Sequence, residues 1–336
     1  MNISGLGDPS SRATALVTDS LVWDNHGCLP LEDAPHWMPQ LARYKASGFD
    51  VVHINIGDSD IPLERIVRTL ASFRRWLSDH SNEYTLVERV QDITEARLHG
   101  RLAVCFDIEG AQALGENLAL IAMFYDLGVR WMLIAYNCAN LVGGGCHDAV
   151  DRGLTAFGRR FLEEMDRVGM IKDLAHTGYR TAMDVLEATR VPVTISHSNP
   201  RALNDHPRCV PDDLMKACAA CGGVLGISGH GLFLGRNDIS TANMVHSIDY
   251  SVQLMGIDHV GLGLDFVFDQ TGAAESLEGK RHIWPENLGY GREIQFLPPE
   301  RLTEIVEALL MRGYRDADVA KIVGGNFLRV ANRVWK

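Results

Sequence analysis

The alternation of short apolar runs with segments of helical spacing is the feature that most constrains the fold of this chain. It is clearest over residues 170–200, where two apolar runs, 170–175 and 191–195, flank a segment, 178–189, whose apolar residues recur at helical spacing. This pattern predicts a strand, a helix and a second strand. Because a short buried strand followed by a crossover helix is typical of parallel sheets, the segment indicates an α/β fold.

Eight apolar runs of this kind occur along the chain, and each is followed by helical material, such as the segments 61–78 and 82–99. The predicted strands are 15–23, 51–56, 102–106, 131–135, 170–175, 191–195, 223–227 and 259–264. Eight strand–helix units predict a (β/α)8 barrel. The expected organisation is a single domain over residues 1–336, with C-terminal helices within 298–335 packed on the barrel.

Polar side chains that suit metal chemistry follow most of these predicted strands. They are His26, Cys28, Glu109, Tyr136, His176, His197 and Asp265. A doubly wound sheet also alternates strands and helices, but it would leave the ends of its first and last strands far apart. Only a closed barrel brings all these side chains to one mouth, so their distribution favours the barrel.

Histidine and carboxylate groups at strand ends are suitable ligands for Zn²⁺ or a similar divalent ion. Glu109 can bridge two ions through its two oxygens, and an ion lowers the pKa of its bound water from about 16 to about 7. Asp265, in the glycine-rich stretch GLGLDF, is suited to take the proton of that water and return it to the leaving nitrogen. These residues predict hydrolysis of an amide by attack of a metal-bridging hydroxide.

Composition narrows the classes of partner. The formal net charge of -11 argues against a nucleic-acid partner, which would require a basic face. The sequence contains no run of 18 apolar residues, so no membrane span is expected. The N-terminal stretch lacks a basic start and an apolar core, and the seven cysteines are scattered, so we expect a cytoplasmic protein without a disulfide framework.

Several stretches together resemble the membrane (renal) dipeptidase family of the amidohydrolase superfamily. They are DNHGCLP at 24–30, DIEGA at 107–111, LGVR at 127–130, GLTAFGRRFLEEMDRVGMIKDLAH at 153–176, PVTISHSNPRAL at 192–203, VPDD at 210–213, GLGLDF at 261–266 and GGNFLRV at 324–330. The resemblance extends from residue 24 to near the C-terminus. It implies a (β/α)8 barrel with two zinc ions that hydrolyses dipeptides, so the expected partner is a small-molecule substrate.

The resemblance also implies roles for individual residues. Glu109 resembles the carboxylate that bridges the two ions. His176 and His197 resemble the ligands of one ion, and His26 resembles a ligand of the other. Asp265 resembles the acid/base group. Arg208, just before VPDD, resembles the arginine that binds the carboxylate of the substrate, a task that suits a bidentate guanidinium.

Two positions depart from the family pattern. Cys28 stands where the family usually has an aspartate ligand, and a thiolate is a softer ligand for zinc. Tyr136 stands where the family usually has a histidine close to the substrate carbonyl, and its hydroxyl can donate a hydrogen bond there. Both departures bear on which amide is hydrolysed.

Two alternatives to a dipeptidase stay open from the sequence. One is an amidohydrolase that acts on another small amide or a lactam, and the other is a catalytically silent metal-binding protein on the same fold. The polar insert 269–295 is expected either to cover the mouth of the barrel or to bind a neighbouring subunit, with a homodimer as one alternative.

Overall fold

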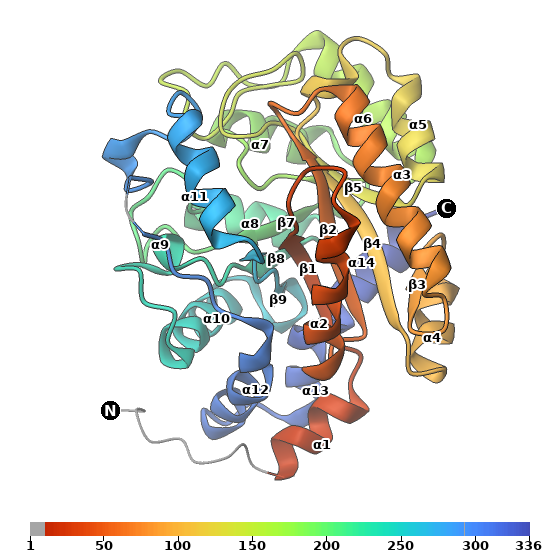
Figure 1. Cartoon of the computed structure of the whole chain (residues 1–336). Coiled ribbons are helices and arrows are strands. Elements are labelled where there is room, and N and C mark those ends of the chain that lie inside the picture. Colours follow the sequence, from red (N-terminus) through yellow and green to blue (C-terminus); the bar gives the residue numbers. More distant parts are fainter. Residues whose placement is uncertain (1–10, 292) are drawn as a thin grey trace.

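The computed structural model describes residues 11–291 and 293–336, and its centre is a closed ring of parallel strands (Figure 1). In ring order the strands are β1 (Trp23–Cys28), β2 (Val51–Asp58), β4 (Leu102–Glu109), β5 (Val129–Leu133), β6 (Ile171–Asp173), β7 (Thr194–Ser198), β8 (Val224–Ile227) and β9 (Val260–Leu262). The ring closes where β1 pairs with β9 through Asp24 and Leu262. The predicted (β/α)8 barrel is confirmed.

Helices surround the strands, most of them on the outside of the ring (Figure 1). They are α1 (Ser11–Asp19), α2 (Ala42–Ala46), α3 (Leu63–Asp79), α4 (Val90–Leu98), α5 (Ala119–Asp126), α6 (Ala156–Val168), α7 (Tyr179–Ala188), α8 (Asp212–Ala220), α9 (Gly231–Leu234), α10 (Thr241–Met255), α11 (Gln270–Gly279), α12 (Leu302–Met311), α13 (Asp316–Ala320) and α14 (Asn326–Val334). Local signals set several of their ends. At α6, for example, the hydroxyl of Thr155 accepts from the N–H of Gly158, and Gly169 ends the helix at a φ of 93°.

The prediction of a strand over 15–23 is wrong. Most of that run belongs to α1, and the first barrel strand begins only at Trp23. Ala13 and Val17 lie four residues apart on one buried face of α1, and this helix packs against α12 and α13. The residues of β1 after Trp23 are mostly polar, as the barrel mouth requires, so no apolar run marks this strand in the sequence.

The prediction of an uninterrupted helix over 82–99 is also wrong. A short strand, β3 (Tyr84–Leu86), pairs with β4 outside the ring before α4 begins. Tyr84 is buried there and its ring lies 4.9 Å from that of Trp76. A second extra strand, β10 (Phe266–Val267), pairs with β1 just beyond Asp265. Tertiary pairing therefore decides both short strands.

Large rings fill the barrel interior beneath the mouth. The His53 ring is stacked between Trp23, at 5.6 Å, and Trp131, at 6.1 Å between ring centroids. Burial lowers the pKa of His53 well below its usual value, so this imidazole is a neutral part of the core. The layer of rings supports the polar side chains above it.

The described residues of the insert 269–295 lie over the mouth of the barrel, as one of the two expected placements requires, and the binding of a neighbouring subunit stays a prediction. Its helix α11, light blue in Figure 1, follows β10 directly. Lys280 reaches Asp58 at the end of β2, with 3.2 Å between Nζ and Oδ2. In the part of the insert after α11, the carbonyl of Ile283 accepts a hydrogen bond from Nδ1 of His147 at 2.9 Å.

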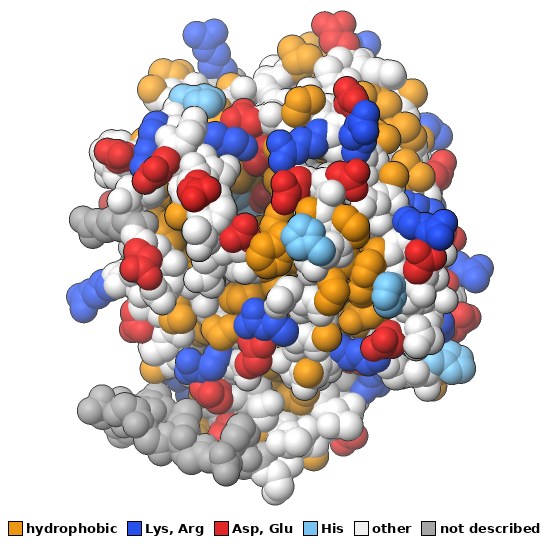
Figure 2. Space-filling view, viewed as in Figure 1, with side chains coloured by type: hydrophobic (Ala, Val, Ile, Leu, Met, Phe, Trp, Pro, Cys, Tyr) orange, Lys and Arg blue, Asp and Glu red, His pale blue; other side chains and the backbone are white. Residues whose placement is uncertain are grey.

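Within the described ranges no helix combines the length and apolar character needed to cross a membrane. On the face drawn in Figure 2, acidic and basic side chains are interspersed over the helices rather than gathered by sign. Apolar side chains also appear between them, most closely together near the middle of this face.

Candidate metal centre

All the polar side chains singled out in the sequence, except Arg208, lie at the mouth where the strands end. They come from the strands or the turns directly after them: His26 and Cys28 from β1, Glu109 from β4, Tyr136 after β5, His176 after β6, His197 from β7 and Asp265 between β9 and β10. The register is irregular in β1 between Asp24 and Gly27 and in β7 between Ile195 and Ser198, around two of the histidines. Such irregularities redirect a side chain relative to the regular strand.

One oxygen of Glu109 stands at the centre of three imidazoles. Its Oε1 lies 3.5 Å from Nε2 of His26, 3.3 Å from Nε2 of His176 and 3.1 Å from Nε2 of His197. The same oxygen is buried and makes no hydrogen bond within the described residues. The Nε2 atoms of His176 and His197 are 3.1 Å apart. Four ligand atoms thus converge on one small volume.

A second group of ligand atoms shares His26. Cys28 Sγ lies 3.3 Å from Nε2 of His26 and 3.8 Å from Oδ1 of Asp265. Asp265 Oδ1 is itself 3.8 Å from that histidine nitrogen. Two ligand sets, one with His26, Glu109 and His197 and one with His26, Cys28 and Asp265, therefore meet at a common side chain.

A polar partner orients each of the three imidazoles through its other nitrogen. Nδ1 of His26 faces Oδ2 of Asp107 at 3.3 Å, and Nδ1 of His176 faces Oδ1 of Asn137 at 2.7 Å. Nδ1 of His197 lies 2.7 Å from the hydroxyl of Ser196, which in turn donates to Asp173. This arrangement leaves every Nε2 free to face Glu109, as metal-bound histidines are usually held.

These orienting partners are not among the site residues predicted from the sequence. Each was nevertheless close to a predicted ligand: Asp107 precedes Glu109 by two residues on the same strand, and Ser196 directly precedes His197. Asn137 follows Tyr136 in the turn after β5. Alternation along a strand puts Asp107 and Glu109 on one face, and this was the signal available.

The pKa shifts of the clustered side chains are those expected of a site that binds a cation. Burial raises the pKa of Glu109 to about 8, although the nearby His26 acts to lower it. Burial also lowers the pKa of His176 and of His197 well below the usual value, so both imidazoles are neutral and keep a lone pair on Nε2. A buried carboxylate oxygen without a partner, facing neutral imidazoles, is a donor set that a divalent ion would complete.

His26 differs in charge from the other two histidines. Burial acts to lower its pKa, but the neighbouring Cys28 and Asp107 raise it well above the usual value. Burial raises the pKa of the Cys28 thiol to about 12, against the effect of His26. The neighbouring acidic groups therefore favour the protonated form of His26.

Two of the predicted site residues have a backbone conformation that side chains other than glycine rarely adopt. His176 and Asp265 have φ values of 58° and 59°, and Asn137, beside His176, has a φ of 57°. The N–H of Asp265 donates to the carbonyl of His26 at 2.9 Å, which ties the last strand to the first. Such strained positions are common where a fold holds functional groups in place.

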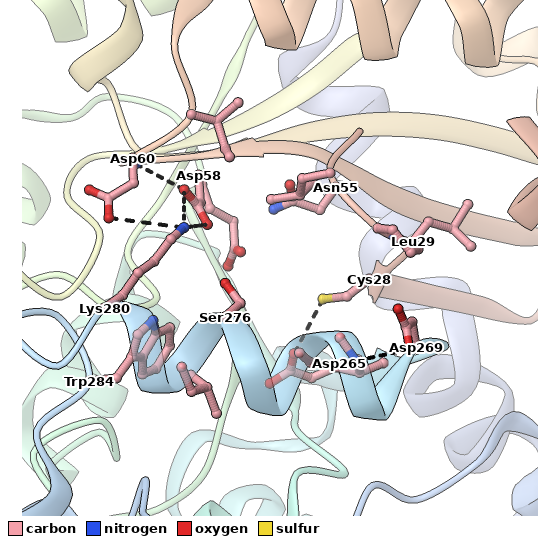
Figure 3. A pocket seen from close by; sticks show the side chains of 18 of the residues that line it. Cys28, Leu29, Asn55, Asp58, Asp60, Asp265, Asp269, Ser276, Lys280 and Trp284 are labelled. Atoms are coloured by element: carbon pink, nitrogen blue, oxygen red, sulfur yellow. Dashed lines mark hydrogen bonds and ion pairs between the residues drawn. The ribbon is translucent and has the colours of Figure 1, made fainter. Parts of the chain in front are cut away.

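The ligand atoms open into a cavity of about 450 Å³. Cys28, Glu109, Tyr136, His176 and Asp265 line its floor, and α11 with the residues that follow it forms one wall (Figure 3). The Tyr136 ring stacks on that of His176, with 4.3 Å between centroids, and Trp284 from the insert stands edge-on to Tyr136. The cavity has the size of a small-molecule site.

Arg208 is placed differently from the other predicted residues. It lines a smaller cavity of about 190 Å³, which shares His176 with the main one. The side chain is only 2% exposed, and Nη2 donates to the carbonyl of His197 at 2.8 Å. Its Nε is buried and has no hydrogen-bond partner among the described residues. The arginine therefore adjoins the metal cluster but does not line the main cavity.

The sequence of this chain is similar to a protein family and to several known proteins. The membrane dipeptidase family (peptidase family M19) matches residues 49–282. An uncharacterized dipeptidase of Schizosaccharomyces pombe is 32% identical over 223 residues, covering 62% of this chain and 53% of that protein. Dipeptidase aclJ of Aspergillus oryzae is 33% identical over 240 residues, covering 70% of this chain and 52% of that protein. The chain thus spans about half the length of these curated relatives.

A solved structure supports the same assignment. The crystal structure of an amidohydrolase from Pseudomonas aeruginosa superimposes with a TM-score of 0.87 at 27% identity, covering 96% of this chain and 99% of that one. Together with the family match over residues 49–282, the fold and the sequence show that the chain belongs to the membrane dipeptidase family.

Proposed function

We propose that this protein is a zinc-dependent dipeptidase that hydrolyses the amide bond of a dipeptide. The observation that carries the proposal is the single unpaired oxygen of Glu109, buried within 3.1–3.5 Å of three imidazole nitrogens. Family membership supports a metallohydrolase, and the curated relatives are named dipeptidases.

The residues that would hold two zinc ions are those predicted from the sequence. His176 and His197 would bind one ion, His26 and Cys28 the other, and Glu109 would be shared. Imidazole, carboxylate and thiolate are the ligand types that zinc prefers, so zinc suits this set better than magnesium or calcium. Bound zinc supplies Lewis-acid polarisation of a carbonyl and a lowered pKa for water.

Asp265 is proposed as the group that moves the proton. Burial raises its pKa, although His26 and Arg208 act to lower it, and a raised pKa makes the carboxylate a better base. Oδ2 accepts a hydrogen bond from the Ser228 hydroxyl at 3.3 Å, whereas Oδ1 points toward Cys28 and the cavity (Figure 3). Oδ1 would take the proton of the attacking water and return it to the leaving nitrogen.

Two further side chains would position the substrate. The Tyr136 hydroxyl would donate to the carbonyl oxygen as negative charge develops there. Arg208 would bind the terminal carboxylate of the dipeptide. Its buried, unpaired Nε and its closeness to His176 support this role, but the side chain would have to face the main cavity to fulfil it.

The test is metal content measured together with turnover. We expect the purified protein to hold about two zinc ions and to hydrolyse members of a panel of L-Xaa-L-Xaa and L-Xaa-D-Xaa dipeptides. Glu109→Ala and His197→Ala should lose metal and lower kcat/KM at least about a hundredfold. The reason is that an ion with fewer ligands is bound more weakly, and without it neither the water nor the carbonyl is activated. The surface variant His99→Ala is the control and should keep both. Undiminished zinc in Glu109→Ala would defeat the metal assignment.

A second candidate, hydrolysis of another small amide or a lactam, is favoured by the two departures at Cys28 and Tyr136. Both alter groups that would touch the ion or the carbonyl. Turnover of such amides without turnover of any dipeptide in the panel would select this candidate. Stoichiometric metal without turnover of any amide would instead favour a catalytically silent protein.

A further inference from the structure

Asn55 carries a hydrogen-bond donor that no other described residue uses, in the wall of the main cavity. It lies in β2, is 1% exposed and lines the cavity together with Glu109 and Asp265. Its Oδ1 accepts from the backbone N–H of Gly57 at 2.7 Å, whereas its Nδ2 is buried without a hydrogen-bond partner. Figure 3 shows this side chain facing the space between Asp58 and Cys28.

The contact with Gly57 decides which end of the carboxamide is free. A backbone N–H can only donate, so the atom that faces Gly57 must be the oxygen, and the free end is the NH₂ group. A buried donor without a partner is unfavourable unless something else accepts from it. The free NH₂ group of Asn55 therefore calls for an acceptor from outside the protein.

The position of Asn55 around the ring indicates which part of a substrate it would meet. Strands β2 and β7 stand on opposite sides of the eight-stranded ring, and Arg208 follows β7. A dipeptide whose carboxylate pointed toward Arg208 would extend its N-terminal residue across the metal cluster toward β2. The charged α-amino group of that residue has no lone pair, so it cannot accept from Asn55.

Polar side chains from α11 and from the residue directly after it adjoin the part of the cavity that Asn55 lines. Lys280 pairs with Asp58, and Ser276 projects from α11 toward the same space (Figure 3). The ion pair occupies the carboxylate that would otherwise attract a cationic side chain. The NH₂ group of Asn55 is then a neutral donor that a ligand in the cavity could use.

We propose that Asn55 is a specificity-determining residue that donates to an oxygen on the side chain of the substrate's N-terminal residue. The favoured substrates are then dipeptides whose N-terminal side chain carries a hydrogen-bond acceptor. This inference rests on the proposed dipeptidase function. It adds a preference that the metal cluster alone would not create.

The test compares two substrates that differ by a single acceptor oxygen, L-methionyl-glycine and its methionine sulfoxide analogue. We expect the wild-type enzyme to favour the sulfoxide by about tenfold in kcat/KM, because its oxygen gives the buried donor a partner. In Asn55→Asp the acceptor for Gly57 is kept but the donor is lost, so the preference should disappear or reverse. Asn55→Ala is a second variant and should abolish the preference as well.

Controls separate this inference from the proposed function. Asn332→Asp adds the same charge on the exposed face of α14 and should keep the wild-type ratio. Calorimetric titration with the non-hydrolysed phosphinate analogues of the same pair gives a ratio of Kd values that does not require turnover. If the wild type hydrolyses both peptides and the ratio is unchanged in both Asn55 variants, the inference fails while the dipeptidase assignment stands. If the wild type neither hydrolyses nor binds any dipeptide, both fail.

Discussion

Cys28 is the proposed metal ligand for which the sequence resemblance led us to expect an aspartate in the family. Its Sγ lies 3.3 Å from Nε2 of His26, so it stands at ligand distance in the proposed second zinc position. Burial raises the pKa of the thiol to about 12, and only a cation bound directly to the sulfur would favour the thiolate strongly enough.

Replacing Cys28 tests whether it is a ligand. We expect Cys28→Asp to keep about two ions and to change kcat/KM by about tenfold, because a harder oxygen ligand alters the Lewis acidity of the ion. Cys28→Ala should lose one of the two ions. Elemental analysis and dipeptide kinetics measure both effects. Two ions at full occupancy in Cys28→Ala would show that the thiol is not required, and Cys221→Ala serves as the matched cysteine control.

Asp265 has a φ that side chains other than glycine rarely adopt. Because its proposed role is proton transfer and not metal binding, its replacement should change the reaction rate but not the metal content. Asp265→Asn keeps the size of the side chain and the acceptor for Ser228 but cannot take a proton. We expect kcat to fall by about 10²–10⁴ with the zinc content unchanged. A variant that keeps its metal and most of its rate would assign the proton transfer to another group.

At the scale of elements, polar and aromatic contacts help to hold the described residues of the insert 269–295 against the barrel. His147 bonds the carbonyl of Ile283 through Nδ1 and lies 3.2 Å from the Tyr290 hydroxyl through Nε2. Trp284 and Tyr290 pack against each other at 4.8 Å between ring centroids. The helix α11 itself has no fully buried residue. These contacts by His147, Trp284 and Tyr290 help to hold this part of the cavity wall in place.

His147 makes the stability of the fold depend on pH. Burial lowers its pKa from 6.5 to about 4, so between these values the unfolded chain binds a proton that the folded chain does not. Its contribution is therefore present above pH 6.5 and is lost as the pH falls toward 4. The shift corresponds to about 3 kcal/mol at most.

The prediction is that the unfolding free energy of the wild type falls more steeply between pH 6.5 and 4 than that of His147→Asn. The asparagine can still donate to Ile283 but does not titrate. Denaturant unfolding at several pH values measures the two slopes. Parallel curves for the two proteins would show that His147 is not responsible, and His206, which bonds Leu288 in the same segment, would be examined next.

At the scale of the whole molecule, the closed ring brings together several buried carboxyl groups. Neighbouring residues do not fully compensate the negative charges of these groups. Burial raises the pKa of Asp107 to about 6 and that of Glu109 to about 8, which shows how poorly each charge is compensated without an ion. Bound cations would relieve this cost in the folded state only. The metal is thus expected to stabilise the barrel as well as to serve catalysis.

Removal of the metal should lower the melting temperature. At a free zinc concentration of about 1,000 times Kd, binding adds about 4 kcal/mol to the unfolding free energy, which corresponds to a shift of several degrees. Scanning calorimetry of chelated and zinc-reconstituted protein measures it. Glu109→Ala should show no such response. An identical melting temperature with and without zinc would contradict the proposed site.

The sequence by itself determined the barrel and most of the candidate site. Strand periodicity and the polar residues at strand ends predicted the closed ring, and the structure brings His26, Glu109, His176 and His197 together as expected. These signals are local, because each ligand directly ends its own strand or follows it closely. The single-domain organisation, the cytoplasmic location and the homodimer stay predictions.

Only the tertiary structure decided the rest. The strand at Trp23–Cys28 was placed too early because its side chains are polar, and β3 depends on pairing with a strand distant in sequence. The free NH₂ group of Asn55 and the placement of Arg208 outside the main cavity depend on which neighbours the ring brings near. A sequence pattern indicates the local structure and chemistry that a residue favours. Contacts between segments distant in the sequence decide which structure it adopts and which partners it has.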